Sequence, residues 1–135
     1  MQKILVGYDG SEGAKQALNK AKALINENGE IVLLAVVPSP KDESFLDKNI
    51  YKDLEKKANT ILDEAIQNLG SPHFKVNGLV ENGDAAEKII DISHEMKCDL
   101  IVLGSSGTSK ISRYLLGSVA NKVVQYAHVP VMVVR

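Results

Sequence analysis

Glycine and hydroxyl residues crowd one stretch of the chain, where their backbone and side-chain groups could bind an anion. Gly104, Gly107, Gly117 and Ser118 have the spacing G-x2-G-x9-G-S. Glycine lets backbone N–H groups turn toward a ligand, and hydroxyl groups donate further hydrogen bonds to oxyanions. Ser118 also begins an amphipathic segment, and the free N–H groups of a helix start favour a phosphate. The spacing therefore predicts a phosphate site between residues 104 and 118.

This loop must supply several contacts at once to hold a polyphosphate. One exposed helix end contributes only about 0.3 to 1 kcal/mol. Lys110 and Arg113 would add positive charge, and a divalent cation would bind through the phosphates. The alternative is a polar loop in which both cations are simply solvated, because glycine and serine are common in all loops.

Asp9 is a second candidate for a ligand contact, because it ends the first apolar run of the chain. It lies within GYDGS, where Ser11 is a typical helix cap. The glycines here have the spacing G-x2-G-x2-G, which is not the dinucleotide pattern G-x-G-x2-G, and the chain has no P-loop sequence. Aspartate is also a common turn former, so the position alone leaves both interpretations open.

Apolar periodicity predicts five strands that alternate with four helices. Apolar runs predict strands at residues 2–7, 31–37, 74–80, 99–103 and 129–134, and stripes at three- and four-residue spacing predict helices near 14–25, 44–69, 84–96 and 116–127. Such alternation implies an α/β fold with a five-stranded parallel sheet of order 3-2-1-4-5 and helices on both faces, a Rossmann-like three-layer sandwich. Its ligands bind beyond the carboxyl ends of the strands, where Asp9 and the glycine loop fall.

Length and composition limit the classes of function. A chain of 135 residues suits a single domain over 1–135. Its 16 basic and 17 acidic residues give a formal net charge of −1, which predicts no general attraction to nucleic acid or acidic lipid. Cys98, the single cysteine, cannot form an internal disulfide, and no apolar stretch approaches the roughly 20 residues of a membrane span. We therefore expect a cytoplasmic protein without a membrane partner.

The glycine spacing and its surroundings together resemble the universal stress protein family. The similarity also covers three longer segments, ILVGYDGSEGAKQAL, VENGDAAEKII and VANKVVQYAHVPVMVVR. It spans most of the chain and is least distinctive in the long helix. The resemblance implies binding of ATP, with ADP or AMP as alternatives, together with Mg²⁺ or Mn²⁺ held through the phosphates. Our hypothesis for the function is that ATP occupancy orders the loop at 104–118 and acts as a nucleotide-dependent switch in stress response or signalling.

The resemblance further implies roles for individual residues. Those near the ribose and adenine would be Gly7, Asp9, Ser11 and, through its backbone, Val36. The ribose side would be lined by Leu103 and Gly104. The phosphates would be met by Gly107, Thr108, Arg113, Gly117, Ser118 and Val119. Many ATP-binding members have a basic residue where this chain has Thr108, which leaves the choice among ATP, ADP and AMP open.

The residue pattern does not predict an efficient enzyme. His73, His94 and His128 are widely spaced and form no metal-ligand pattern, and no side-chain metal site is expected. The tetrad GSSG at 104–107 is not the nucleophile sequence G-x-S-x-G. No general base or water-positioning residue can be assigned near the loop, so at most slow ATP hydrolysis is expected.

The strand predicted at 129–134 would leave an open, apolar sheet edge. Pairing with a second copy would close this edge, and the resemblance implies the same homodimer. The alternative is a strand covered by the chain's own helices. A partner-binding domain of the same fold without nucleotide is the alternative for the function as a whole.

Overall fold

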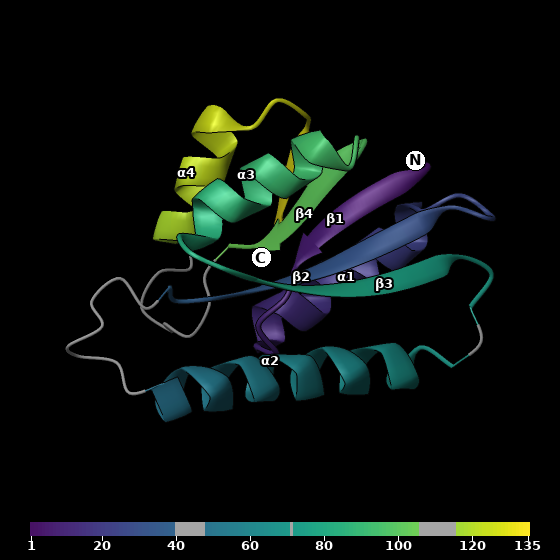
Figure 1. Cartoon of the computed structure of the whole chain (residues 1–135). Helices are drawn as coiled ribbons and strands as arrows, with labels where there is room; N and C mark the ends of the chain where they lie inside the picture. Colours follow the sequence, from purple (N-terminus) through teal and green to yellow (C-terminus); the bar gives the residue numbers. More distant parts are fainter. Residues whose placement is uncertain (40–47, 71, 106–115) are drawn as a thin grey trace.

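The computed structural model describes residues 1–39, 48–70, 72–105 and 116–135, and these ranges hold five strands and four helices (Figure 1). The strands are β1 (Lys3–Gly7), β2 (Glu30–Val37), β3 (Lys75–Asn82), β4 (Leu100–Gly104) and β5 (Val131–Val134). The helices are α1 (Glu12–Leu24), α2 (Lys48–Asn68), α3 (Ala85–Glu95) and α4 (Ser118–Tyr126). None of these helices combines the length and the apolar character needed to cross a membrane.

The strands form one parallel sheet in the order β3-β2-β1-β4-β5, which confirms the predicted order. β1 is central and pairs with β2 as far as Gly7 and Leu34, and with β4 as far as Val6 and Val102. The chain moves from β1 outward to β3 and then returns to the other side of β1. The carboxyl ends of β1 and β4 therefore border the switch point at which open α/β sheets bind ligands.

Helices α1 and α2 cover one face of the sheet, and α3 and α4 cover the other (Figure 1). Ile4 and Val6 belong to the core on the α1–α2 face, whereas Leu5 belongs to the core on the α3–α4 face. Because successive side chains of a strand alternate between faces, the end of β1 places Gly7 on the α3–α4 face and Tyr8 on the other. The predicted three-layer arrangement is confirmed.

Several boundaries differ from the sequence prediction. β5 begins at Val131 and not at residue 129, because Pro130 has no N–H and only its carbonyl joins the sheet, accepting from Ile101 N at 3.0 Å. Helix α2 begins at Lys48, and residues 44–47 lie outside the described ranges. Leu24 belongs to the apolar stripe that predicts α1, but it ends the helix and is 37% exposed.

Candidate functional site

A pocket of about 440 Å³ lies at the carboxyl ends of β1, β2 and β4. Its walls also include residues from the first turns of α1, α3 and α4. Cavities of roughly 300 to 1,000 Å³ are typical of small-molecule sites. The pocket is therefore large enough for a ligand of cofactor size.

Nine predicted ligand contacts line this pocket, and they come from four separate segments of the chain. They are Gly7, Asp9, Ser11, Val36, Leu103, Gly104, Gly117, Ser118 and Val119. The other three predicted contacts, Gly107, Thr108 and Arg113, lie outside the described residues, as does Lys110. The structure thus brings the nine described residues together around one cavity, while their contact with a nucleotide stays a prediction.

Two glycines allow close approach of the elements around the pocket. A Cβ atom at Gly7 would lie 2.8 Å from Leu103 Cδ2 and 3.3 Å from Ile89 Cδ1. A Cβ atom at Gly104 would lie 2.8 Å from the carbonyl carbon and 2.9 Å from the oxygen of Gly13. Backbone atoms cannot rotate aside as a flexible side chain can, so Gly104 is the stricter requirement. It lets the end of β4 touch the first turn of α1 directly.

The carboxylate of Asp9 is held by the turn in which it lies. Its Oδ1 accepts a hydrogen bond from the Ser11 backbone N–H at 2.9 Å, and Gly10 between them has φ +82°. This left-handed conformation favours glycine. Ser11 Oγ then accepts from Ala14 N at 3.2 Å and caps α1, as predicted. Among the described residues nothing bonds the second carboxylate oxygen, which leaves an acceptor beside the pocket.

The backbone of Val36 faces the pocket because β2 is longer than β1 at this end. The last contact of β1 with β2 is the hydrogen bond from Tyr8 N to Leu34 O at 2.8 Å, and β2 continues to Val37. Val37 O accepts from Gly83 N at 3.0 Å, toward the β3 side. Because backbone groups alternate in direction along a strand, those of Val36 point toward the side that β1 has vacated. They can therefore bond to the edge of a ligand.

Helix α4 starts without a side-chain cap. Gly117 is its N-cap, and no side-chain hydrogen bond is formed there in the described residues. The first backbone bond of the helix is from Asn121 N to Gly117 O at 2.9 Å, which leaves the preceding N–H groups available. By contrast α1 is capped by Ser11, and α3 by Asp84, whose Oδ2 accepts from Glu87 N at 3.0 Å. Of these three helix starts, only α4 has no side chain bonded to its first amides among the described residues.

A backbone hydrogen bond joins the two ends of the segment between β4 and α4. Gly117 N donates to Ser105 O at 2.5 Å, and Ser105 N donates to Val134 O at 2.9 Å. Ser105 and Gly117 both line the pocket. The two ends of the predicted phosphate loop are thus held beside each other and beside the end of β5.

Charge is unevenly distributed around the pocket. Burial raises the pKa of Tyr8, and the nearby carboxylates of Asp9, Glu12 and Glu64 raise it further, so this phenol stays neutral at physiological pH. Acidic groups therefore gather around the end of β1, whereas the start of α4 presents the positive end of a helix dipole. An anionic part of a ligand is favoured at α4, and a hydroxyl donor is favoured at Asp9.

No cluster of three or more metal-ligating side chains occurs in the part of the chain that the structure describes. The rings of His94 and His128 have centroids 5.2 Å apart, but no third ligand joins them in those ranges. Cys98 is 4% exposed, and burial raises the pKa of its thiol to about 11. The thiol is therefore packed and protonated, and it is a poor nucleophile.

The sequence prediction missed the apolar part of the pocket. The missed lining residues are Tyr8, Ala14, Leu34, Ala85, Ile89 and Ala120. Ile89 and Ala120 lie on apolar helix stripes, but periodicity does not show which turn faces a cavity. Leu34 had a usable signal, because it precedes Val36 by two residues and lies on the same face of its strand. Val119 lies on the apolar stripe of α4 but is 37% exposed where it lines the pocket.

Comparison with known proteins finds relatives along the full chain. Residues 1–135 match the universal stress protein family. A universal stress protein of Thermus aquaticus is 35% identical over 136 residues, which cover 98% of this chain and 97% of the relative. The solved structure of protein MJ0577 of Methanocaldococcus jannaschii superposes with a TM-score of 0.81 at 31% identity, covering 98% of this chain and 94% of that one.

Two further solved structures of this fold contain a nucleotide. One is a universal stress protein in complex with cAMP, with a TM-score of 0.72 at 24% identity over 99% of this chain and 97% of that one. The other is an Arabidopsis thaliana protein with AMP bound, with a TM-score of 0.70 at 18% identity over 99% and 91%. At these identities the likeness shows the fold alone. The family match over residues 1–135 and the shared fold together establish that this chain belongs to the universal stress protein family.

Proposed function

We propose that this protein binds ATP in the pocket at the carboxyl ends of β1, β2 and β4 and acts as a nucleotide-dependent switch in stress response or signalling. One observation carries the proposal. A cavity of about 440 Å³ has a carboxylate acceptor, Asp9, in one wall and the uncapped start of α4 in another. A nucleoside phosphate has the matching groups, since its sugar donates hydrogen bonds and its phosphates accept them.

The adenine base fits the strand ends. Val36 and Leu103 supply apolar surface, and the outward backbone groups of Val36 would bond to the edge of the base. The ribose hydroxyls would donate to Asp9. The phosphates would then lie at Ser118 and Val119, where the helix amides attract negative charge.

Charge balance supports a role for a divalent cation. None of the described residues that line the pocket is a lysine or an arginine. Backbone amides alone supply only partial charges, so a triphosphate needs further compensation. Mg²⁺ or Mn²⁺ would bind through phosphate oxygens and water, which requires no cluster of protein carboxylates. We therefore expect ATP to bind more tightly when Mg²⁺ or Mn²⁺ is present.

Calorimetric titration with ATP, with and without Mg²⁺, tests the proposal. We expect saturable binding with a Kd below 1 mM, tighter with the cation, and titrations with ADP, AMP and cAMP then rank the alternatives. Denaturing freshly purified protein and identifying any released nucleotide is an independent check. Absence of binding at millimolar ATP would reject the proposal in favour of a partner-binding domain that uses this fold without nucleotide.

We also propose that two copies pair through the edge strand at 129–134. β5 pairs with β4 on one side and has no strand partner on its other side among the described residues. All four residues of β5 are only partly buried, which is the exposure that a second copy would remove. Sedimentation should show a dimer at micromolar concentration, and a monomer there would contradict the pairing. We place this single nucleotide-binding domain, 1–135, in the cytoplasm.

A further inference from the structure

Ile61 of helix α2 lies beside the turn that carries Asp9. A Cβ atom added at Gly10 would lie 3.1 Å from Ile61 Cγ2, 3.6 Å from its Cδ1 and 3.7 Å from its Cγ1. Gly10 stands between Asp9 and Ser11, which both line the pocket, whereas Ile61 does not line it. The branched side chain of Ile61 therefore covers the turn from the α2 side without reaching the cavity.

This contact is distinct from the packing of α2 onto the sheet. Leu62 and Ala65 are buried in the core of the α1–α2 face, and the half-buried Ile66 packs against that core. Ile61 is half-buried like Ile66, but it is not among the described side chains that pack against the core. Core packing therefore does not explain why Ile61 is half-buried, whereas its position beside Gly10 does.

The helix is itself anchored to the sheet at β3. Asn82 Nδ2 donates to Tyr51 Oη at 2.7 Å near the start of α2. Farther along, a Cβ atom at Gly78 of β3 would meet Ile66 Cδ1 and Leu62 Cβ at 3.4 Å, which is ordinary contact. Ile61 lies between these two anchors. It therefore presents a fixed surface to the turn.

The hydrogen bonds within the Asp9–Ser11 turn fix its internal shape more than its position relative to the sheet. The bond from Ser11 N to Asp9 Oδ1 closes the turn on itself, and Gly10 adds no side chain of its own to pack on neighbours. The bond from Tyr8 N to Leu34 O holds the residue before the turn, and Ile61 adds a contact at Gly10 within the turn itself. A turn that leaves its binding position part of the time lowers the apparent affinity for a ligand by the fraction of time spent away.

We infer that Ile61 is a positioning residue of the pocket, which holds the Asp9–Ser11 turn in place for the ligand without touching the ligand. Its effect on affinity rests on the proposed nucleotide function. The position of the turn can be measured without nucleotide, through hydrogen exchange of the Ser11 amide that bonds to Asp9. Failure of this inference and failure of the proposed function are therefore distinguishable.

The test compares two matched truncations on α2. Ile61→Ala should weaken ATP binding by about three- to tenfold, in the range of couplings carried by residues outside a binding site. It should also speed exchange of the Ser11 amide in the absence of nucleotide. Ile66→Ala removes the same atoms from the same helix, but on the core side. It should lower thermal stability while ATP affinity and Ser11 exchange stay within about twofold of wild type.

Two further variants separate contact from volume. Ile61→Val keeps Cγ2, the atom nearest Gly10, and should restore both affinity and slow exchange. Ile61→Leu keeps the volume but removes Cγ2, so it should behave like Ile61→Ala and serves if the alanine variant does not fold. Ser11 exchange in Ile61→Leu that equals wild type would overturn the inference. If wild type fails to bind ATP, the proposed function fails, and Ser11 exchange still decides the role of Ile61.

Discussion

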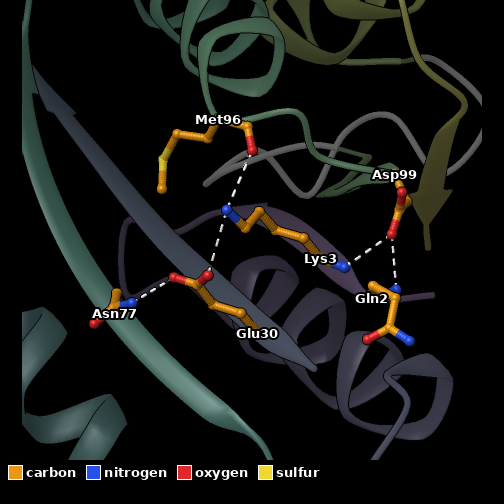
Figure 2. A network of polar contacts seen from close by, with 6 residues as sticks. All are labelled: Gln2, Lys3, Glu30, Asn77, Met96 and Asp99. Atoms are coloured by element: carbon orange, nitrogen blue, oxygen red, sulfur yellow. Dashed lines mark hydrogen bonds and ion pairs between the residues drawn. The ribbon is translucent and has the colours of Figure 1, made fainter. Parts of the chain in front are cut away.

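At the amino ends of the strands polar side chains bond to one another, whereas at the carboxyl ends glycines and backbone amides surround a cavity. Figure 2 shows the network at the amino ends. Lys3 Nζ lies 3.4 Å from Glu30 Oε1 and donates to Met96 O at 3.2 Å. Asn77 Nδ2 donates to the other Glu30 oxygen. This part of the network joins β1, β2, β3 and the end of α3.

A second part of the same network joins β1 to the start of β4. Asp99 Oδ2 accepts from the backbone N–H groups of Gln2 at 2.7 Å and Lys3 at 2.9 Å (Figure 2). Asp99 N donates in return to Lys3 O at 2.8 Å. One carboxylate thus satisfies two backbone donors that precede the part of β1 paired with β4.

The contrast between the two ends separates stability from binding. Groups that satisfy each other inside the protein contribute to the free energy of unfolding and have little left for a ligand. Backbone amides without a protein partner, as at the start of α4, bind ligands at some cost to stability. Changes at the amino ends should therefore alter unfolding and leave affinity unchanged, and changes at the carboxyl ends should alter affinity.

The largest effect is expected at Gly104, where Gly104→Val should abolish ATP binding. The new side chain would collide with the backbone of Gly13, so β4 and α1 must separate at the pocket. Overpacking of this kind costs about 1–3 kcal/mol of unfolding free energy. Urea denaturation and ATP titration measure the two losses. Gly78→Ala is the control, because its added Cβ would meet only side chains at 3.4 Å, and it should bind ATP normally.

Ser118→Asp should separate affinity from stability in a single variant. A carboxylate in the first turn of α4 interacts favourably with the helix dipole and should add about 0.3–1 kcal/mol to the free energy of unfolding. The same charge repels phosphate, so ATP affinity should fall about tenfold, which corresponds to about 1.4 kcal/mol. Ser118→Asn, without the charge, should show a much smaller loss. Equal affinity of the Asp and Asn variants would place the phosphates elsewhere.

At the other end, Asp99→Asn should lower the free energy of unfolding by about 0.5–1 kcal/mol at pH 7, because the charged acceptor of two N–H groups is lost from an exposed site. ATP affinity should stay within about twofold of wild type. Urea denaturation with parallel ATP titration measures both. A clear loss of affinity would show that the two ends are coupled through β1 or β4 and that stability and binding are not separate.

The pH dependence of the stability of Asp99→Asn tests the direction of the pKa shift of Asp99. Hydrogen bonds from the Lys3 and Gln2 backbone lower the pKa of Asp99 in the folded protein. The stabilisation is therefore fully present above the pKa of the unfolded chain, about 3.9, and is lost as the pH falls through the lower folded value. The free energy of unfolding of wild type should exceed that of Asp99→Asn by a constant amount from pH 6 to 8. This difference in unfolding free energy should narrow below about pH 4. A difference that widened there would contradict the role of the charged Asp99 as the acceptor of these two hydrogen bonds.

The smallest effect is expected for Lys3→Met. The pair with Glu30 is partly exposed, with side-chain exposures of 29% and 20%, and Glu30 keeps its bond from Asn77. Such pairs are worth about 0.5 kcal/mol, and salt screens part of that. Thermal unfolding at low and at high salt should show a small difference that shrinks at high salt. A loss much above 1 kcal/mol would mean that the whole network acts as a unit.

Most of the fold could be predicted from the sequence because its elements differ strongly in pattern. The uninterrupted apolar run at 31–37 indicates a strand buried on both faces, and the helices show apolar stripes. Ser11 was predicted as a cap from its position, and the three-residue spacing of Asp84 and Glu87 marks the start of α3 in the same way. The end of β3 was set two residues early, at 80 instead of Asn82, because its pairing with β2 extends to Val37 and overrides local preference.

The candidate site could be predicted only where glycine or a polar group marks it. Gly7, Asp9 and Ser118 stand out at strand and helix ends, whereas Leu34 and Ile89 are of residue types found throughout the core. Ile89 reaches the cavity because Gly7 opposite it has no side chain, a relation between distant segments that no local pattern contains. The assignments at Gly107, Thr108 and Arg113 stay predictions.

The hydrogen bond between Gly117 N and Ser105 O, which joins the ends of the segment between β4 and α4, has a consequence for protein engineering. A backbone hydrogen bond holds Ser105 and Gly117 together, so the two ends of the intervening chain are fixed beside each other. The entropy of closing a loop rises slowly with length, by about 0.6 kcal/mol per doubling. Peptides of other lengths and charges could therefore be spliced between these two residues, and new ligand preferences selected, while the sheet beneath is left as it is.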